Sequence, residues 1–177
     1  MVDAGKLRTH VARGLGALAS ALSLAGCATP SSLAPGTPET EVIRHFGRPA
    51  EVYPLPAPPQ ARRLAYRIGA FQQQTWMVDV DAQGRVLRVR QVISAEHFAQ
   101  IRVGKDDQTV IRREFGPPRV EETFARLGLT SWSYPYLEDG FRYSEMSIYF
   151  DRSGIVQRVE NGPDPRFLGG HDNDVPL

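Results

Sequence analysis

Few ionisable side chains in this sequence are spaced so that they could carry out catalysis. His45 stands alone in a predicted helix, and the side chains of the adjacent Glu96 and His97 would point apart on a helix. The neighbouring carboxylates at 121–122 are typical of a solvated face, and the His and Asp residues at 171–174 lie in a polar end segment without preorganised metal geometry. There is no Gly-x-Ser-x-Gly, phosphate-loop or zinc-ligand pattern. The sequence therefore predicts no catalytic residue and no metal site, and it favours a binding protein over an enzyme.

Cys27, the single cysteine among 177 residues, has the clearest chemical prediction. It follows a basic start and an apolar run over 15–25 that is too short to span a bilayer. The stretch Leu-Ala-Gly-Cys at 24–27 resembles the lipobox of bacterial lipoproteins, in which the thiol receives a diacylglycerol and the chain is cut just before it. The resemblance implies a signal peptide over 1–26 and a covalent lipid on Cys27 as the only cofactor. Ala28 implies sorting to the outer membrane.

The alternative for this N-terminal stretch is a core helix with Cys27 as a small buried residue. A core helix would have a polar and an apolar face, but this run is apolar on all sides after Arg13. We therefore favour the signal peptide. No later run of the sequence approaches the length of a transmembrane helix.

The charge balance excludes further classes of function. Removal of 1–26 takes away three of the 21 basic and one of the 20 acidic residues, which leaves a net charge of −1. Nucleic-acid binding proteins usually carry a strong basic excess, so no nucleic-acid partner is predicted. Electrostatic attachment to anionic lipid is also disfavoured, so the lipid anchor would hold the protein to the outer membrane.

The remainder of the chain contains two copies of one pattern. Gly36 and Gly104 each precede a Val-Ile pair by six residues, and a Phe-Gly pair and a proline follow. An aromatic strand segment comes next, and then an Asp-x-x-Gly turn ends at Gly84 or Gly154. Agreement at so many positions in one order predicts a tandem duplication.

Each copy predicts a helix followed by strands. In the first copy, Thr37 as N-cap and Pro38 as first helical residue would begin a helix that Gly47 ends. Three strands with one apolar and one polar face follow, as is typical of an antiparallel sheet covered on one side. The predicted fold class is α+β, with two tandem units that each pack a short helical segment on one face of a three-stranded antiparallel meander.

These patterns divide the chain into five predicted parts. They are a signal peptide (1–26), a tether (27–36), a first unit (37–93), a second unit (94–162) and a disordered tail (163–177).

The motifs of the two units resemble the BamE (SmpA/OmlA) family of outer-membrane lipoproteins. The second copy carries nearly all of the family pattern, at Gly104, Val110, Phe115, Gly116, Pro118, Trp132, Tyr134, Phe150, Asp151 and Gly154. The resemblance implies a lipid-anchored protein of the outer membrane that faces the periplasm and binds an envelope protein such as the barrel-assembly machinery. The Gly-Asn-Tyr-Leu-like segment of the family's single-domain members is not present.

Candidate partner-contacting residues lie on the strand faces that should not pack on the helices, and around one turn. They are Arg67, Met77, Arg88, Arg90 and Tyr149, with the aromatic residues Tyr136, Phe141 and Tyr143. The alternative explanations, which these residue types favour at least as much, are an ordinary charged sheet face and packing at strand ends.

Two functions stay open at this point. One is a structural or adaptor role in envelope or outer-membrane protein assembly through protein–protein binding. The other is an inhibitor or ligand-binding module with a concave double sheet, because the tandem pair is also similar to the scaffold of β-lactamase inhibitor proteins.

Overall fold

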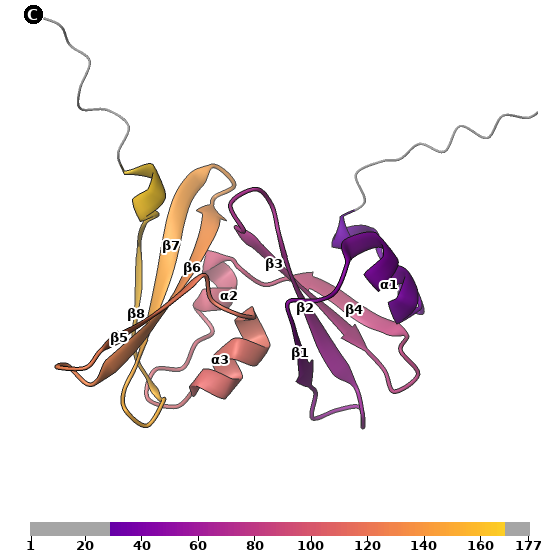
Figure 1. Cartoon of the computed structure of the whole chain (residues 1–177), viewed down its shortest axis with the longest axis horizontal. Coiled ribbons are helices and arrows are strands. Elements are labelled where there is room, and N and C mark those ends of the chain that lie inside the picture. Colours follow the sequence, from indigo (N-terminus) through magenta and orange to yellow (C-terminus); the bar gives the residue numbers. More distant parts are fainter. Residues whose placement is uncertain (1–28, 169–177) are drawn as a thin grey trace, which may run out of the picture.

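The computed structural model describes residues 29–168, and Figure 1 labels their helices and strands. In chain order the elements are η1 (Pro30–Ser32), α1 (Glu39–Phe46), β1 (Glu51–Pro54), β2 (Arg62–Ile68), β3 (Gln74–Val80), β4 (Val86–Gln91), α2 (Ala95–Phe98), α3 (Gln108–Phe115), β5 (Val120–Phe124), β6 (Leu129–Glu138), β7 (Arg142–Phe150), β8 (Val156–Pro163) and η2 (Pro165–Phe167). Within this part of the chain, no helix has the length and apolar character needed to cross a bilayer. The predicted signal peptide and Cys27 lie outside the described residues.

The strands form two four-stranded antiparallel sheets, with the orders β1-β2-β3-β4 and β5-β6-β7-β8. The prediction of a three-stranded meander in each unit is therefore wrong, and so is the fold class built on it. The missing strands, β1 and β5, are short edge strands with mostly polar or exposed residues. They are strands because they pair with β2 and β6, and that pairing leaves little trace in their own sequences.

Helix α1 covers one face of the first sheet. Its Val42 and Phe46 pack in a core cluster with the apolar residues Leu64, Tyr66, Val78, Val80 and Val86. The helix ends where predicted, at Gly47, which has a φ of 76°. The predicted N-cap is wrong, because the Thr37 hydroxyl donates instead to the Ala34 carbonyl at 2.7 Å and Pro38 occupies the cap position.

Helices α2 and α3 cover one face of the second sheet. Phe98 and Phe115 stack with their ring centroids 4.9 Å apart, and both lie against Tyr134. The Ser94 hydroxyl accepts a hydrogen bond from the His97 amide at 3.2 Å and so caps α2. One face of each sheet is thus covered by the helical segment of its own copy, and the two sequence copies form similar units.

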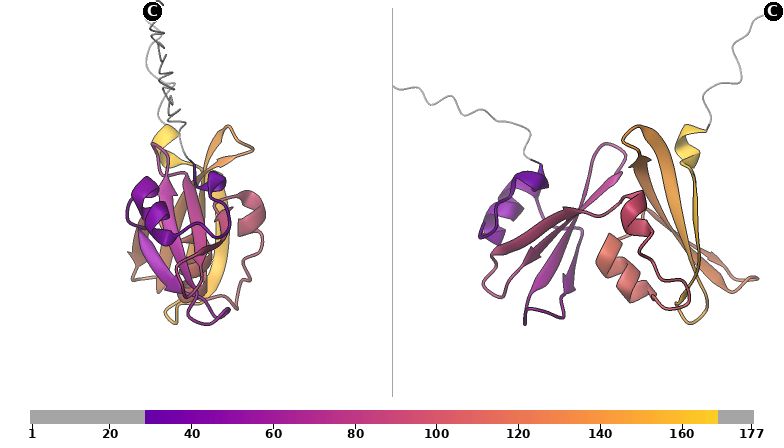
Figure 2. Two further views of the ribbon diagram at one scale, coloured as in Figure 1. Left: turned by 90° about the vertical axis from the view of Figure 1, so that its right-hand side faces the viewer. Right: turned by 180° about the vertical axis from the view of Figure 1, so that it is seen from behind.

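The second unit also covers the other face of the first sheet, which the sequence predicts to be open. Ala65 and Met77 belong to the same core cluster as Ile111 and Phe115 of α3. The chain therefore forms four layers: α1, the first sheet, α2 with α3, and the second sheet (Figures 1 and 2). Helices α2 and α3 lie between the sheets, so residues 29–168 contain no concave face shared by both sheets. One face of the second sheet remains open.

Both ends of the described chain are folded, which corrects the predicted tether over 29–36 and the predicted tail over 163–168, while 27–28 and 169–177 lie outside the described residues. Pro30 is buried in η1, and Leu33 packs against the core of the first unit. At the other end, Asp164 is fully buried and accepts from the amide of Arg166 at 3.0 Å, which begins η2. The local sequence of each segment contains few apolar residues. The partners that order each segment come from distant parts of the chain, so its order was not predictable from the sequence.

One end of the molecule, here called the hairpin end, contains η1, the β2–β3 turn, the β6–β7 turn and η2. All four segments lie toward the top of Figure 1, with η1 beside α1 at one side and η2 beside β7 at the other (Figures 1 and 2). The described chain therefore begins and finishes at the same end.

Candidate functional site

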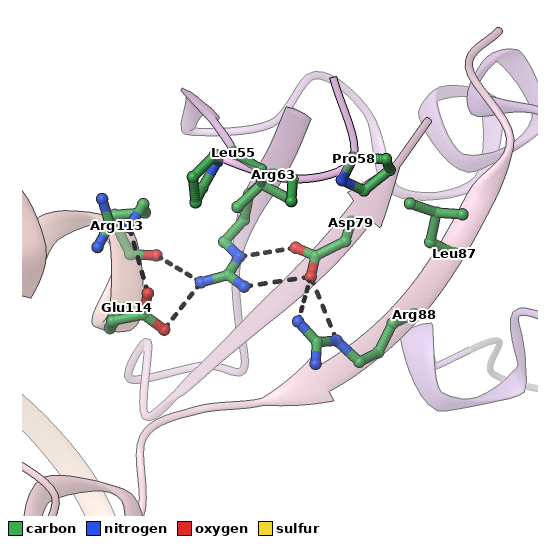
Figure 3. Close-up of a pocket in the computed structure, with 10 residues that line it drawn as sticks. Leu55, Pro58, Arg63, Asp79, Leu87, Arg88, Arg113 and Glu114 are labelled. Atoms are coloured by element: carbon green, nitrogen blue, oxygen red, sulfur yellow. Dashed lines mark hydrogen bonds and ion pairs between the residues drawn. The ribbon is translucent and has the colours of Figure 1, made fainter. Parts of the chain in front are cut away.

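A pocket of about 350 Å³ lies between the first sheet and helix α3. We call it the arginine crevice, and Figure 3 shows the side chains around it. It is lined by Leu55, Pro56, Ala57, Pro58, Arg63, Asp79, Leu87, Arg88, Arg113 and Glu114. Strands β2, β3 and β4 contribute the charged groups on one side, α3 contributes those on the other, and the Pro-rich β1–β2 loop closes one edge.

Arg63 is the centre of this site, and its side chain is only 3% exposed. Its guanidinium donates to both carboxylate oxygens of Asp79, at 2.6 and 3.1 Å. A third nitrogen donates to the Glu114 carboxylate at 2.9 Å and to the Arg113 carbonyl at 3.1 Å. One buried cation therefore joins the first sheet to the last turn of α3, and all of its described contacts are charge-assisted or to backbone.

Asp79 is held as a carboxylate by two guanidiniums. Arg88 also donates to it, at 2.8 Å, from the neighbouring strand. Burial by itself would raise the pKa of Asp79, but the hydrogen bonds from Arg63 and Arg88 outweigh it, so the pKa is lowered. Burial likewise opposes ionisation of Glu114, and Arg63 nonetheless lowers the pKa of that side chain. Both groups are therefore carboxylates near neutral pH and act as hydrogen-bond acceptors for the guanidiniums around them.

Arg90 lies on the same face of β4 as Arg88, two residues along the strand. The ion pairs found within residues 29–168 leave it without a carboxylate partner. Burial, followed by repulsion from Arg88 and Arg63, lowers the pKa of Arg90. The guanidiniums here outnumber the carboxylates, so they can accept an anionic group from outside. We call these side chains the arginine group: Arg63, Arg88, Arg90 and Arg113, with Asp79 and Glu114.

His97 adjoins this group from the second unit. Its ring packs edge-on against Phe115, with the ring centroids 4.8 Å apart, and its Nε2 is buried without a hydrogen-bond partner in the described part of the chain. Burial lowers the pKa of His97, Arg90 lowers it further, and Glu114 acts in the opposite direction. The histidine is therefore neutral at pH 7 and sits at the edge of the arginine group.

We expect acid to destabilise the protein in two ranges of pH. A His97 pKa below its unfolded value of about 6.5 means that the unfolded chain binds more protons, so the free energy of unfolding falls as pH drops through that value. The lowered pKa values of Asp79 and Glu114 extend this loss below about pH 4.5. Urea unfolding midpoints measured from pH 7.5 to pH 3.5 check the trend. His97→Gln should remove the loss between pH 7 and 5.5 only, and an unchanged slope in that range would contradict the assignment.

The structure places two of the predicted contact residues between the units. Met77 is 1% exposed in the shared core, where it cannot touch a partner of the folded chain. Arg67 donates to the Pro118 carbonyl at 3.2 Å and so contacts the second unit. Arg88 and Arg90 lie on β4 in the arginine group, and both are at least partly exposed.

The predicted aromatic group is divided. Tyr136 is fully buried, and its hydroxyl donates to Asn161 at 3.0 Å, so it is a core residue. Phe141 and Tyr143 are exposed at the hairpin end. Tyr149 lies on the open face of the second sheet, with the Arg158 guanidinium 4.1 Å from its ring centroid.

Sequence reasoning missed the central group of the crevice. The alternation of β2 and β3 would have placed Arg63 and Asp79 on one face, which is a usable signal for the cross-strand pair. Nothing in the sequence indicated Arg113, Glu114 or the loop at 55–58, because they reach the site only through the packing of one unit on the other.

Comparisons with known proteins give no identification. No family model matches the sequence, and no curated protein matches it. Among solved structures, the chain is similar to a DUF4309 family protein (YjgB) from Bacillus subtilis subsp. subtilis str. 168, with 16% sequence identity and a TM-score of 0.30. The match covers 72% of this chain and 79% of that chain, and its TM-score is too low to support a conclusion about fold or function.

Proposed function

We propose that this protein is a lipid-anchored adaptor of the outer membrane that faces the periplasm and binds an acidic segment of an envelope protein at the arginine crevice. The anchor is the lipid on Cys27, supported by the lipobox sequence. The observation that carries the binding site is the excess of guanidiniums around Arg88 and Arg90. The BamE-like motifs support an envelope role, and the barrel-assembly machinery is one candidate partner.

The chemistry of the crevice favours a carboxylate-bearing peptide as the ligand. Guanidiniums bind carboxylates through paired, charge-assisted hydrogen bonds. Arg88 is half-exposed and Arg90 partly exposed, so both can reach a ligand while Arg63 stays committed to Asp79 and Glu114. The exposed side chains of Leu87 and the loop prolines add apolar contacts beside the charges.

The position of the crevice suits a membrane-anchored protein. In the β2–β3 ladder, the pair Ile68–Gln74 lies next to the turn. The pair Arg63–Asp79 lies five residues further along the strands. At about 3.4 Å per residue, the crevice begins roughly 17 Å from that end of the hairpin. A partner could therefore bind while the hairpin end, where the described chain begins, stays at the membrane.

Site-specific crosslinking tests this proposal. A photoreactive amino acid replaces Leu87 in the full chain, which is expressed in Gram-negative bacterial cells. The peptide captured on illumination is then identified by mass spectrometry. We expect an acidic peptide, and we expect Arg88→Gln with Arg90→Gln to reduce capture by about tenfold or more, because each charge-assisted hydrogen bond contributes about 1.5–3 kcal/mol. Mass spectrometry of the protein from these cells should show Cys27 as the first residue of the mature chain, with acyl chains attached.

The matched control for the crosslinking is Arg152→Gln, which removes an exposed charge in the β7–β8 turn. Capture that is lost equally in this control, or that persists in the double variant, would contradict the binding site. A free thiol at Cys27, or a chain that keeps 1–26, would contradict the anchor.

The alternative of an inhibitor or ligand-binding module stays open only in a modified form. Its concave double sheet is filled by α2 and α3 in the described residues. Such a module would have to use the open face of the second sheet, where Glu145, Ser147 and Glu160 line a shallow pocket of about 480 Å³.

A further inference from the structure

A group of aromatic side chains joins the two units at the hairpin end. Tyr143 and Phe167 stack with ring centroids 4.0 Å apart, and Phe71 packs edge-on against both, at 6.3 and 5.2 Å. Phe71 comes from the first unit, and the other two come from the second. The Arg166 guanidinium donates to the Phe71 carbonyl at 3.2 Å and so holds this arrangement in place.

These rings remain exposed although they pack on one another. Phe71, Tyr143 and Phe167 each keep about two-fifths of their surface in contact with solvent, and Phe141 in the adjacent turn is 74% exposed. Leu168 adds a further exposed apolar side chain after η2. We call these five residues the aromatic rim. A contiguous exposed apolar surface of this kind marks an interaction site.

The start of the folded chain limits what can lie against the aromatic rim. Pro30, the first residue of η1, is buried at the same end of the molecule. It follows Cys27 by three residues, and three residues of chain span at most about 11 Å. If Cys27 carries the lipid, the hairpin end must therefore lie close to the bilayer surface.

We infer that the aromatic rim contacts the bilayer surface and sets the orientation of the anchored protein. This inference rests on the proposed lipid anchor. Aromatic side chains are favoured at the interface between lipid headgroups and acyl chains. The charges beside the rim are paired, Arg166 with Asp164 and Arg142 with Asp139, so the contact does not depend on anionic lipid.

The orientation that follows is specific. The rim and η1 face the lipid, and the arginine crevice lies toward the opposite end, about 17 Å or more along the β2–β3 hairpin from its turn. The acyl chains supply most of the affinity for the membrane, at about 0.8 kcal/mol per buried methylene. The rim therefore changes the orientation of the protein far more than the amount bound.

Fluorescence labelling of the lipidated full chain tests the inference. A lipidated Cys27 has no free thiol, so the substitutions Phe141→Cys and Leu127→Cys each introduce a single labelling site. Leu127 is the matched control, because it is 71% exposed and lies in the β5–β6 turn, at the other end of the ten-residue strand β6. That strand separates the two positions by roughly 30 Å.

The labelled proteins are bound to vesicles of phosphatidylcholine through their lipid anchor. We expect an environment-sensitive dye at position 141 to shift to shorter wavelength and to be quenched by spin-labelled headgroups, while the dye at 127 is unchanged. Equal spectra at the two positions in vesicle-bound protein would overturn the inference and leave the anchor intact. If the dye at position 141 shifts to shorter wavelength only in native membranes, and not in these vesicles, the rim contacts a protein partner. That result would also overturn the inference. A free thiol at position 27 would contradict the proposed anchor, and the inference with it.

Discussion

Replacement of Arg63 by Met is expected to lower the free energy of unfolding by about 3 kcal/mol or more. The guanidinium is buried, and its removal leaves the Asp79 carboxylate in the core with Arg88 alone. It also leaves Glu114 without its partner from the first sheet. The loss lies at the lower end of the range for a broken buried ion pair, about 3–5 kcal/mol, because the half-exposed Arg88 still compensates part of the charge.

Urea unfolding followed by the fluorescence of Trp76 and Trp132 measures this effect, because the two units each contain one of these residues. Arg44→Ala is the control, since Arg44 makes an exposed pair with Glu41 on α1 and should change stability by less than about 1 kcal/mol. A double variant, Arg63→Met with Asp79→Leu, should be more stable than the sum of the single effects predicts. A loss below 1 kcal/mol for Arg63→Met would show that the buried network does not hold the units together.

Gly116→Ala is expected to destabilise the protein by about 2–4 kcal/mol, and its counterpart Gly47→Ala by only about 1 kcal/mol. Both glycines end a helix with positive φ, 80° and 76°, so both substitutions carry the same backbone strain. At Gly116, however, the new methyl group would lie 3.0 Å from Thr75 Cγ2 and 3.3 Å from Met77 Cε on the first sheet. At Gly47 nothing lies within 4 Å.

The difference between the two variants therefore measures how tightly α3 packs on the first sheet. The same urea unfolding experiment gives both values, and the Tyr134 hydroxyl, which donates to the Gly116 carbonyl at 3.1 Å, adds to the expected loss at this position. An equal fall in the free energy of unfolding for Gly116→Ala and Gly47→Ala would show that the units tolerate a small separation. The close approach of helix and sheet would then contribute little to stability.

Both experiments bear on the proposed function, because the arginine crevice exists only while the units stay docked. Arg113 and Glu114 come from the second unit, and Arg63, Asp79 and Arg88 come from the first. A variant that separates the units should therefore reduce partner capture without touching the ligand-facing arginines. The aromatic rim spans the same two units at the hairpin end, so docking also holds Phe71 beside Tyr143.

Local patterns in the sequence were sufficient to predict the two helices that begin the copies, their glycine ends and six of the eight strands. The repeat was visible because each helix and each Asp-x-x-Gly turn depends on residues close together in the chain. The candidate sites were only partly predictable. Arg88 and Arg90 lie on a polar strand face, and Phe141 and Tyr143 flank a turn, which are local signals.

Only the tertiary structure decided how the units meet. Because α3 packs on both sheets, Met77 and Ala65 are core residues although they lie on the face predicted to be open. The polar residues Arg63 and Asp79 are buried by the same contact, since each supplies the charge that the other needs. Helix and strand patterns report which face of an element is apolar, but they do not report which distant element covers it. The edge strands, the buried ion pair and the folded segments at both ends all depend on such distant partners.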